Sequence, residues 1–133
     1  MTIARPALEP GVTWAPLRLP PISRTTLALF AGASGDHSPV HIDSDVAHSA
    51  GLDDVFAHGM LSMAYLGRLL TANVPQDRVR SLTARFTAVT PVHGRPTCTA
   101  TVSSVADGIA RIDLEVRLED GTVTVAGAAE VAV

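Results

Sequence analysis

One short segment of this 133-residue chain concentrates ionisable side chains. It contains two aspartates and two histidines: Asp36, His37, His41 and Asp43. An imidazole titrates near neutral pH, and a carboxylate beside it can share in the transfer of a proton. Glycines precede the segment and Pro39 interrupts it, so we expect a loop in which the side chains of Asp36 and His41 converge. The spacing therefore predicts an acid–base pair made of Asp36 and His41.

Two other interpretations of the same segment compete with this one. His37 and His41 are four residues apart, which on a helix would place both imidazoles on one face and suit a metal ion. Pro39 breaks such a helix, and no third histidine or cysteine has the spacing of a metal ligand, so we expect no metal. The segment could also be a polar surface loop. We favour that interpretation for His37, and for Asp43, which stands where it can cap a short helix.

A second candidate group is the backbone of Gly59. His58 and Gly59 open the clearest helical stretch of the chain, residues 59–72. The first N–H groups of a helix lack intrahelical partners and carry the positive end of its dipole. Gly59 has no side chain, so a ligand can approach its backbone closely. Such a donor can stabilise an oxyanion, which together with an acid–base pair suits proton chemistry next to a carbonyl group.

The first half of the chain carries the signals of three helices and one short strand. The helices are expected over residues 24–33, 44–49 and 59–72. Ser23 and Asp43 can cap the first two. Apolar residues fall on every side of the third, so we expect it to be buried. The strand is expected over residues 12–19, where Pro16 would confine it to the edge of a sheet.

After Pro75 the spacing of apolar residues changes from a period of 3.6 to a period of 2. The alternating stretches are residues 82–88, 98–102, 112–118 and 123–133. Asp107-Gly108 and Asp120-Gly121 are typical turn dipeptides between such strands. An antiparallel sheet with one apolar face needs an apolar element to cover, and the 59–72 helix has the right size. The sequence thus predicts an α+β fold in which a curved antiparallel sheet wraps a long central helix.

Two motifs resemble those of one enzyme family. The MaoC-like (R)-specific enoyl-CoA hydratases and dehydratases have a signature of roughly Gly-Asp-x-Asn-Pro-x-His-x-Asp. It is similar to Ser34-Gly35-Asp36-His37-Ser38-Pro39-Val40-His41-Ile42-Asp43. A second family motif, His-Gly-Met at the start of the central helix, resembles Phe56-Ala57-His58-Gly59-Met60. The resemblance covers about residues 23–133 and implies the hot-dog fold, with residues 1–133 as a single domain.

The resemblance also implies a reaction of fatty acid metabolism. This is the reversible hydration of 2-enoyl thioesters to (R)-3-hydroxyacyl thioesters, with no metal or other cofactor. It implies that Asp36 and His41 are the catalytic pair and that the Gly59 backbone N–H binds the thioester oxygen. Ser38 departs from the usual Asn of the signature, and its hydroxyl could still position a water or the loop. Hot-dog thioesterases and acyl-carrier-protein dehydratases typically have a carboxylate on the central helix, and residues 59–72 contain none.

The expected partners follow from the same resemblance. The substrate would be an acyl thioester of coenzyme A or of an acyl carrier protein. An uncovered edge strand is a liability for a sheet, so we expect a homodimer. Two alternatives stay open at this point. The chain could be the catalytic subunit of a heteromeric hot-dog dehydratase, or a non-catalytic subunit that binds acyl thioesters.

Composition argues against several other classes. The formal net charge is −3, so the basic excess of a nucleic-acid-binding protein is absent. The sequence has no run of 18 apolar residues that would cross a membrane, and its start lacks the apolar core of a signal peptide. A single cysteine, Cys98, excludes an internal disulfide. We therefore expect a cytoplasmic protein that binds neither nucleic acid nor membranes.

Overall fold

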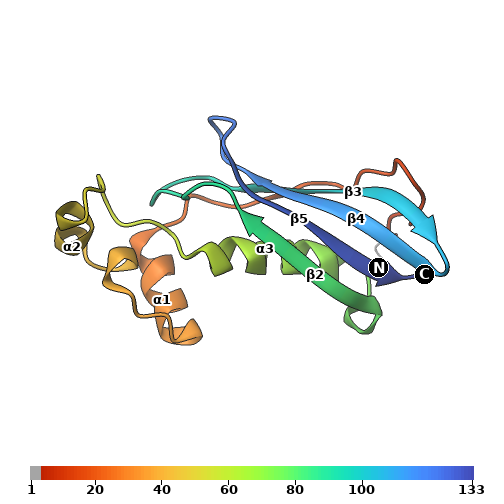
Figure 1. The fold of residues 1–133 in the computed structure, drawn as a ribbon, viewed down its shortest axis with the longest axis horizontal. Helices are drawn as coiled ribbons and strands as arrows, with labels where there is room; N and C mark the ends of the chain where they lie inside the picture. Colours follow the sequence, from red (N-terminus) through yellow and green to blue (C-terminus); the bar gives the residue numbers. More distant parts are fainter. Residues whose placement is uncertain (1–3) are drawn as a thin grey trace.

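The computed structural model describes residues 4–133 as a helix packed against one antiparallel sheet (Figure 1). The elements are β1 (Leu17–Arg18), α1 (Arg24–Ser34), the 3-10 turn η1 (Pro39–His41), α2 (Ser44–Ser49), α3 (Gly59–Asn73), the 3-10 turn η2 (Gln76–Arg78), β2 (Val79–Phe86), β3 (Thr97–Ala106), β4 (Ile109–Arg117) and β5 (Val123–Ala132). The strand order is β1-β3-β4-β5-β2, and every neighbouring pair is antiparallel. α3 contacts β2, β3, β4 and β5, while α1 and α2 lie beyond one end of the sheet. The predicted α+β architecture is confirmed.

The helices begin and end close to the predicted residues because their capping groups are present. Ser23 accepts a hydrogen bond from the backbone N–H of Thr26, and Asp43 accepts one from Asp45 at 2.9 Å. Gly35 ends α1 in the left-handed conformation, at φ 78°. α3 runs one residue further than expected, to Asn73. No helix among residues 4–133 is long and apolar enough to cross a membrane.

The period-2 pattern correctly identifies the buried face of β3 and β4, whereas on β2 Leu82 and Ala84 are only half-buried and Phe86 is 50% exposed. Cys98, Ala100 and Val102 on β3, and Ile112 and Val116 on β4, are all 1% exposed or less. Burial raises the pKa of the Cys98 thiol to about 12. Register irregularities interrupt the pairing of β2 with β5, of β3 with β4 and of β4 with β5. Such irregularities bend and twist strands, which lets the sheet curve around α3.

The edge strand and the last strands differ from the predicted ranges. Of residues 12–19 only Leu17–Arg18 is a strand, and it pairs with β3 at the sheet edge. Thr13 forms an isolated bridge, because Pro16 lacks the N–H that would continue the ladder. β2 begins earlier than expected and ends at Phe86. β5 ends at Ala132, so Val133, expected on the buried face, is 54% exposed.

One side of α3 is open to solvent in the single chain. Leu66, Leu69 and Leu70 are at most 3% exposed and belong to the main core with the sheet. On the opposite side, Met60 is 56% exposed and Ala64 is also exposed. The expectation that this helix is buried all round is therefore wrong for one chain, because the sheet covers only one of its sides.

Candidate active site

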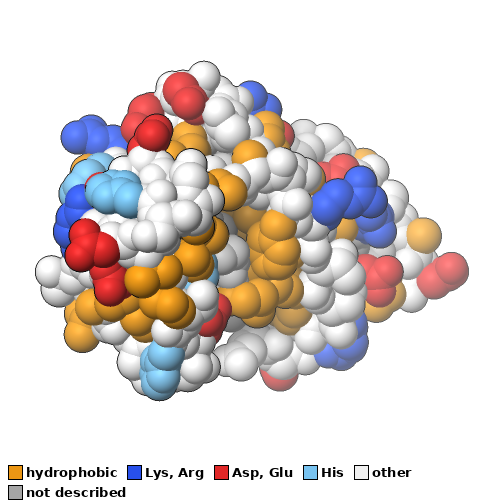
Figure 2. Space-filling model, turned by 60° about the vertical axis from the view of Figure 1, so that its left-hand side comes forward, with side chains coloured by type: hydrophobic (Ala, Val, Ile, Leu, Met, Phe, Trp, Pro, Cys, Tyr) orange, Lys and Arg blue, Asp and Glu red, His pale blue; other side chains and the backbone are white. Residues whose placement is uncertain are grey.

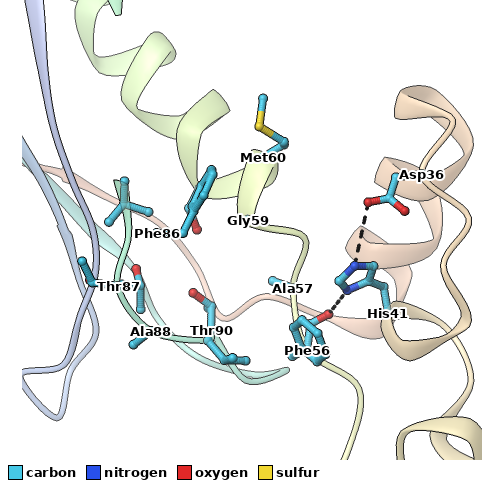
Figure 3. Close-up of a pocket in the computed structure, with 14 residues that line it drawn as sticks. Asp36, His41, Phe56, Ala57, Gly59, Met60, Phe86, Thr87, Ala88 and Thr90 are labelled. Carbon is cyan, nitrogen blue, oxygen red and sulfur yellow. Dashed lines mark hydrogen bonds and ion pairs between the residues drawn. The ribbon is translucent and has the colours of Figure 1, made fainter. Parts of the chain in front are cut away.

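A pocket of about 540 Å³ lies at the N-terminal end of α3. Asp36 and His41 line one wall, and the end of β2 with the residues that follow it, Phe86–Thr90, lines the other (Figure 3). Gly59 lies between the two walls. On the molecular surface, hydrophobic side chains lie on both sides of a hollow (Figure 2). The pocket combines an apolar lining with few polar groups, as ligand sites usually do.

Asp36 and His41 converge in the pocket as predicted. Asp36 Oδ2 lies 3.9 Å from His41 Nε2. The other ring nitrogen, Nδ1, lies 2.7 Å from the backbone oxygen of Phe56. A carbonyl oxygen only accepts hydrogen bonds, so Nδ1 carries the hydrogen of the uncharged ring. The lone pair on Nε2 is then free to face the Asp36 carboxylate and the pocket, which makes this nitrogen a proton acceptor.

Short-range hydrogen bonds hold the Asp36 loop in place. The backbone N–H of Ser38 donates to Asp36 Oδ1 at 3.2 Å, and the backbone N–H of Asp36 donates to Ser34 Oγ at 3.2 Å. Such bonds to side-chain oxygens are typical of turns. Ser38 therefore orients the carboxylate through its backbone. The Ser38 side chain is not among the groups lining the pocket, and the predicted role of its hydroxyl stays a prediction.

Gly59 is the first residue of α3 and borders the pocket. The helix provides no acceptor for its N–H, because no helical turn precedes it. A Cβ at this position would lie 3.0 Å and 3.1 Å from two ring carbons of Phe86. The Phe86 ring thus packs directly over the glycine, and a side chain here would displace it. Gly59 thus lies at the pocket, where it was expected, and the binding of an oxyanion by its N–H stays a prediction.

Sequence analysis did not identify His58 as part of this cluster. Its side chain is 1% exposed and stacks on His41, with ring centroids 4.0 Å apart and planes inclined by 26°. Its Nε2 lies 3.0 Å from the backbone oxygen of Asp36. The available signal was its position in the Phe56–Met60 motif, directly before the glycine. Distance along the chain hid the contact, because 22 residues separate Asp36 from His58.

The cluster of Asp36, His41 and His58 brings together three residue types that bind metals. One candidate ligand atom from each lies within 4.8 Å of the others. The spacing of histidines along the sequence indicates no third candidate ligand, but the fold brings His58 next to Asp36 and His41. A metal ion lies in the plane of each imidazole that binds it. The rings of His41 and His58 are stacked with their planes only 26° apart. One ion cannot lie in both of these nearly parallel planes, so the arrangement does not suit a shared metal ion.

The other ionisable residues of the segment have structural or solvent-facing positions. His37 is exposed, and Asp43 caps α2. The polar-surface interpretation is confirmed for these two residues. The acid–base chemistry available at the pocket is therefore concentrated in Asp36 and His41.

Comparison with known proteins identifies the family. The model of the MaoC like domain matches residues 9–124, so the chain belongs to the MaoC-like domain family. An (R)-specific enoyl-CoA hydratase of Rhodospirillum rubrum is 33% identical over 62% of this chain and 57% of its own length. The 3-hydroxyacyl-thioester dehydratase Z of Mycobacterium tuberculosis is 31% identical over 65% of this chain and 61% of its own length. The chain thus matches only about three fifths of these relatives.

Solved structures agree with the fold. The R-hydratase PhaJ1 from Pseudomonas aeruginosa superposes with a TM-score of 0.84 at 28% identity, over 93% of this chain and 81% of that one. A chain of the ChsH1-ChsH2 complex from Mycobacterium tuberculosis superposes with a TM-score of 0.82 at 23% identity, over 92% of this chain and 95% of that one. At that identity the second comparison establishes the fold alone. The chain has the hot-dog fold that its motifs implied.

Proposed function

We propose that this protein catalyses the reversible hydration of 2-enoyl thioesters to (R)-3-hydroxyacyl thioesters. The observation that carries the proposal is the pairing of Asp36 with His41 in a pocket that Gly59 also borders. The names of the Rhodospirillum rubrum and Mycobacterium tuberculosis relatives support the same reaction class. The apolar residues of the pocket suit an acyl chain, while the polar groups gather at one end of α3.

In the proposed hydration, a water molecule sits between Asp36 Oδ2 and His41 Nε2. Both atoms accept hydrogen bonds, so the water donates to them and turns its oxygen towards the β-carbon of the substrate. As the oxygen bonds to the β-carbon, one water proton passes to the Asp36/His41 pair. The electrons of the carbon–carbon double bond move towards the thioester carbonyl, which becomes an enolate.

The enolate oxygen accepts a hydrogen bond from the Gly59 N–H. One such donor contributes about 3 kcal/mol to transition-state stabilisation in other enzymes. The enolate then collapses and its α-carbon takes a proton from the pair, which completes the addition of water. Dehydration is the same sequence in reverse. Ser38 supports the pair by orienting the Asp36 carboxylate through its backbone N–H.

The proposal extends to the domain and its partners. Residues 1–133 form a single hot-dog domain that acts on an acyl thioester of coenzyme A or of an acyl carrier protein. A second hot-dog subunit covers the edge of β2 and the open side of α3, where Met60 is 56% and Phe86 50% exposed. A homodimer is the first choice. The second choice is a heteromer with a related, non-identical subunit, because a chain of the ChsH1-ChsH2 complex is among the structural relatives.

The test is the hydration of crotonyl-CoA by the purified protein. We expect loss of the enoyl absorbance and formation of the (R)-3-hydroxyacyl product, resolved by chiral chromatography. A product of (S) configuration would contradict the proposal. Failure of the folded protein to hydrate crotonyl-CoA and a longer 2-enoyl-CoA would contradict it as well.

A further inference from the structure

His58 is buried where three parts of the site meet. It stands directly before α3, and its side chain is 1% exposed. The ring stacks on His41 on one side and meets the edge of Phe30 on α1 at a centroid distance of 4.9 Å. The residue that follows it is Gly59, which borders the pocket. His58 thus adjoins α1, the η1 turn and the start of α3.

The hydrogen bond of His58 defines its tautomer. Nε2 lies 3.0 Å from the backbone oxygen of Asp36. Since that oxygen can only accept, Nε2 must carry a hydrogen. Nδ1 is buried and has no hydrogen-bond partner within residues 4–133. The two stacked histidines therefore have opposite tautomers when uncharged, because His41 carries its hydrogen on Nδ1.

We infer that His58 is a positioning residue, which aligns Asp36, His41 and Gly59 through the hydrogen bond from its Nε2–H to the Asp36 backbone oxygen. The inference rests on the proposed function. The bond ties Asp36 to the start of α3 across 22 residues of sequence. The stacked ring supports His41 from the side, and the peptide bond to Gly59 links the oxyanion donor to the same anchor.

The unpartnered Nδ1 separates this role from simple packing. A buried polar atom without a partner is unfavourable, and an apolar ring of similar size would avoid that disadvantage. A residue that only filled space would not need a donor at Nε2. Alignment of reacting groups, in contrast, is sensitive to shifts of about 1 Å, which can lower rates by about 100-fold.

Three variants test the inference by turnover of crotonyl-CoA. H58F keeps an aromatic ring and removes the donor, while H58Q can place an amide N–H near the original Nε2. H48F is the matched control, because His48 Nε2 also bonds a backbone oxygen, that of Asp53 at 2.7 Å, on the exposed surface. We expect H58F to lower kcat at least about 10-fold with KM within about 3-fold. H58Q should recover most of the loss, and H48F should match the unchanged protein.

The inference is overturned if H58F turns over substrate as fast as H48F does. It is also overturned if H58Q is as impaired as H58F, because the ring and not the donor would then matter. Melting temperatures of all three variants accompany the rates. If the fall in kcat of H58F or H58Q is fully explained by a smaller fraction of folded protein, the positioning role of His58 is also overturned.

A nitrogen-15 NMR experiment separates this inference from the proposed function. Long-range proton–nitrogen spectra of the full chain distinguish the two histidine tautomers, and the variants assign the signals. We expect the His58 hydrogen on Nε2, and His41 ring signals that move in H58F and stay in place in H48F. A His58 hydrogen on Nδ1, or His41 signals indifferent to H58F, would overturn the inference. Neither the His58 tautomer nor the His41 signals depend on turnover of a thioester, so this result is independent of the proposed function.

Discussion

The two ends of α3 are held by different apolar clusters. The larger cluster joins Leu66, Leu69 and Leu70, near the C-terminal end, to the inner face of the sheet. The smaller cluster joins Leu61, nearer the N-terminal end, to residues of α1, α2 and the segment before α3. Tyr65 lies between them and packs against both clusters.

The difference separates the part of the molecule that stabilises the sheet from the part that positions the reactive groups. The elements that flank Asp36, His41 and His58 along the chain are packed by the smaller cluster: Leu27 lies on α1, Ala47 on α2 and Val55 before His58. The larger core touches strands that carry no ionisable group at the pocket. The site therefore depends on a few apolar contacts, while most of the buried surface maintains the scaffold.

Truncation of one leucine in each cluster gives the largest effect and tests this separation. Leu66→Ala and Leu27→Ala each remove a side chain that is at most 1% exposed. Each should lower the free energy of unfolding by about 2–5 kcal/mol, measured by urea denaturation. Below the unfolding transition, Leu66→Ala should keep kcat within about 3-fold, whereas Leu27→Ala should lower it about 10-fold because α1 leads directly into Asp36. Equal turnover in the two variants would contradict the separation.

The ion pair between Arg24 and Asp54 sharpens the comparison with a smaller effect. It links α1 to the segment before α3, and Arg24 Nη1 donates to Asp54 Oδ1 at 2.9 Å. The hydrogen-bonded Arg24 guanidinium holds the pKa of Asp54 far below its usual range.

A carboxyl group whose pKa is lowered by folding stabilises the protein above its unfolded pKa, about 4, and loses that contribution as the pH falls. Asp54→Asn should therefore lower the melting temperature at pH 7, by less than either leucine variant because Arg24 is exposed and Asp54 partly exposed to solvent. The difference from the unchanged protein should shrink as the pH is lowered below about 4. A difference that grows in acid would contradict this account.

The smallest effect is expected at Ser38. The backbone N–H of residue 38 bonds the Asp36 carboxylate, and Ser38→Asn keeps that N–H. Asn is also the residue usual at this place in the family signature. Turnover of crotonyl-CoA by the variant should stay within about 3-fold, since the substitution keeps the backbone hydrogen bond of residue 38 to Asp36. Abolished activity would mean that the loop of this chain depends on the Ser38 hydroxyl.

Much of this arrangement could be predicted because its signals are local. Alternation on β3 and β4 identifies the buried face, and caps such as Ser23 mark the helix starts. Asp36 and His41 could be predicted to converge because they are only five positions apart in a loop that Gly35 and Pro39 mark in the sequence. These features depend on neighbours in sequence, where periodicity and turn propensity are informative.

The remaining features depend on contacts between distant segments. The stacking of His58 on His41 requires that α1, the η1 turn and α3 pack together, which no local spacing specifies. The exposed side of α3 depends on how far the sheet curves around the helix. An all-apolar helix has the same pattern whether its last side is covered by its own sheet or by a second subunit.

The most direct test of the account is the turnover of Asp36→Asn and His41→Ala beside that of the unchanged protein, with the unfolding of all three measured under the same conditions. The account predicts that each substitution lowers kcat for crotonyl-CoA by at least about 100-fold, the usual size of acid–base effects. We expect Asp36→Asn to melt close to the unchanged protein, because the Asp36 side chain is exposed. His41→Ala should stay folded but melt lower, because it removes a buried ring that stacks on His58. Near-normal turnover in both variants would contradict the assignment of this pair as the reactive groups.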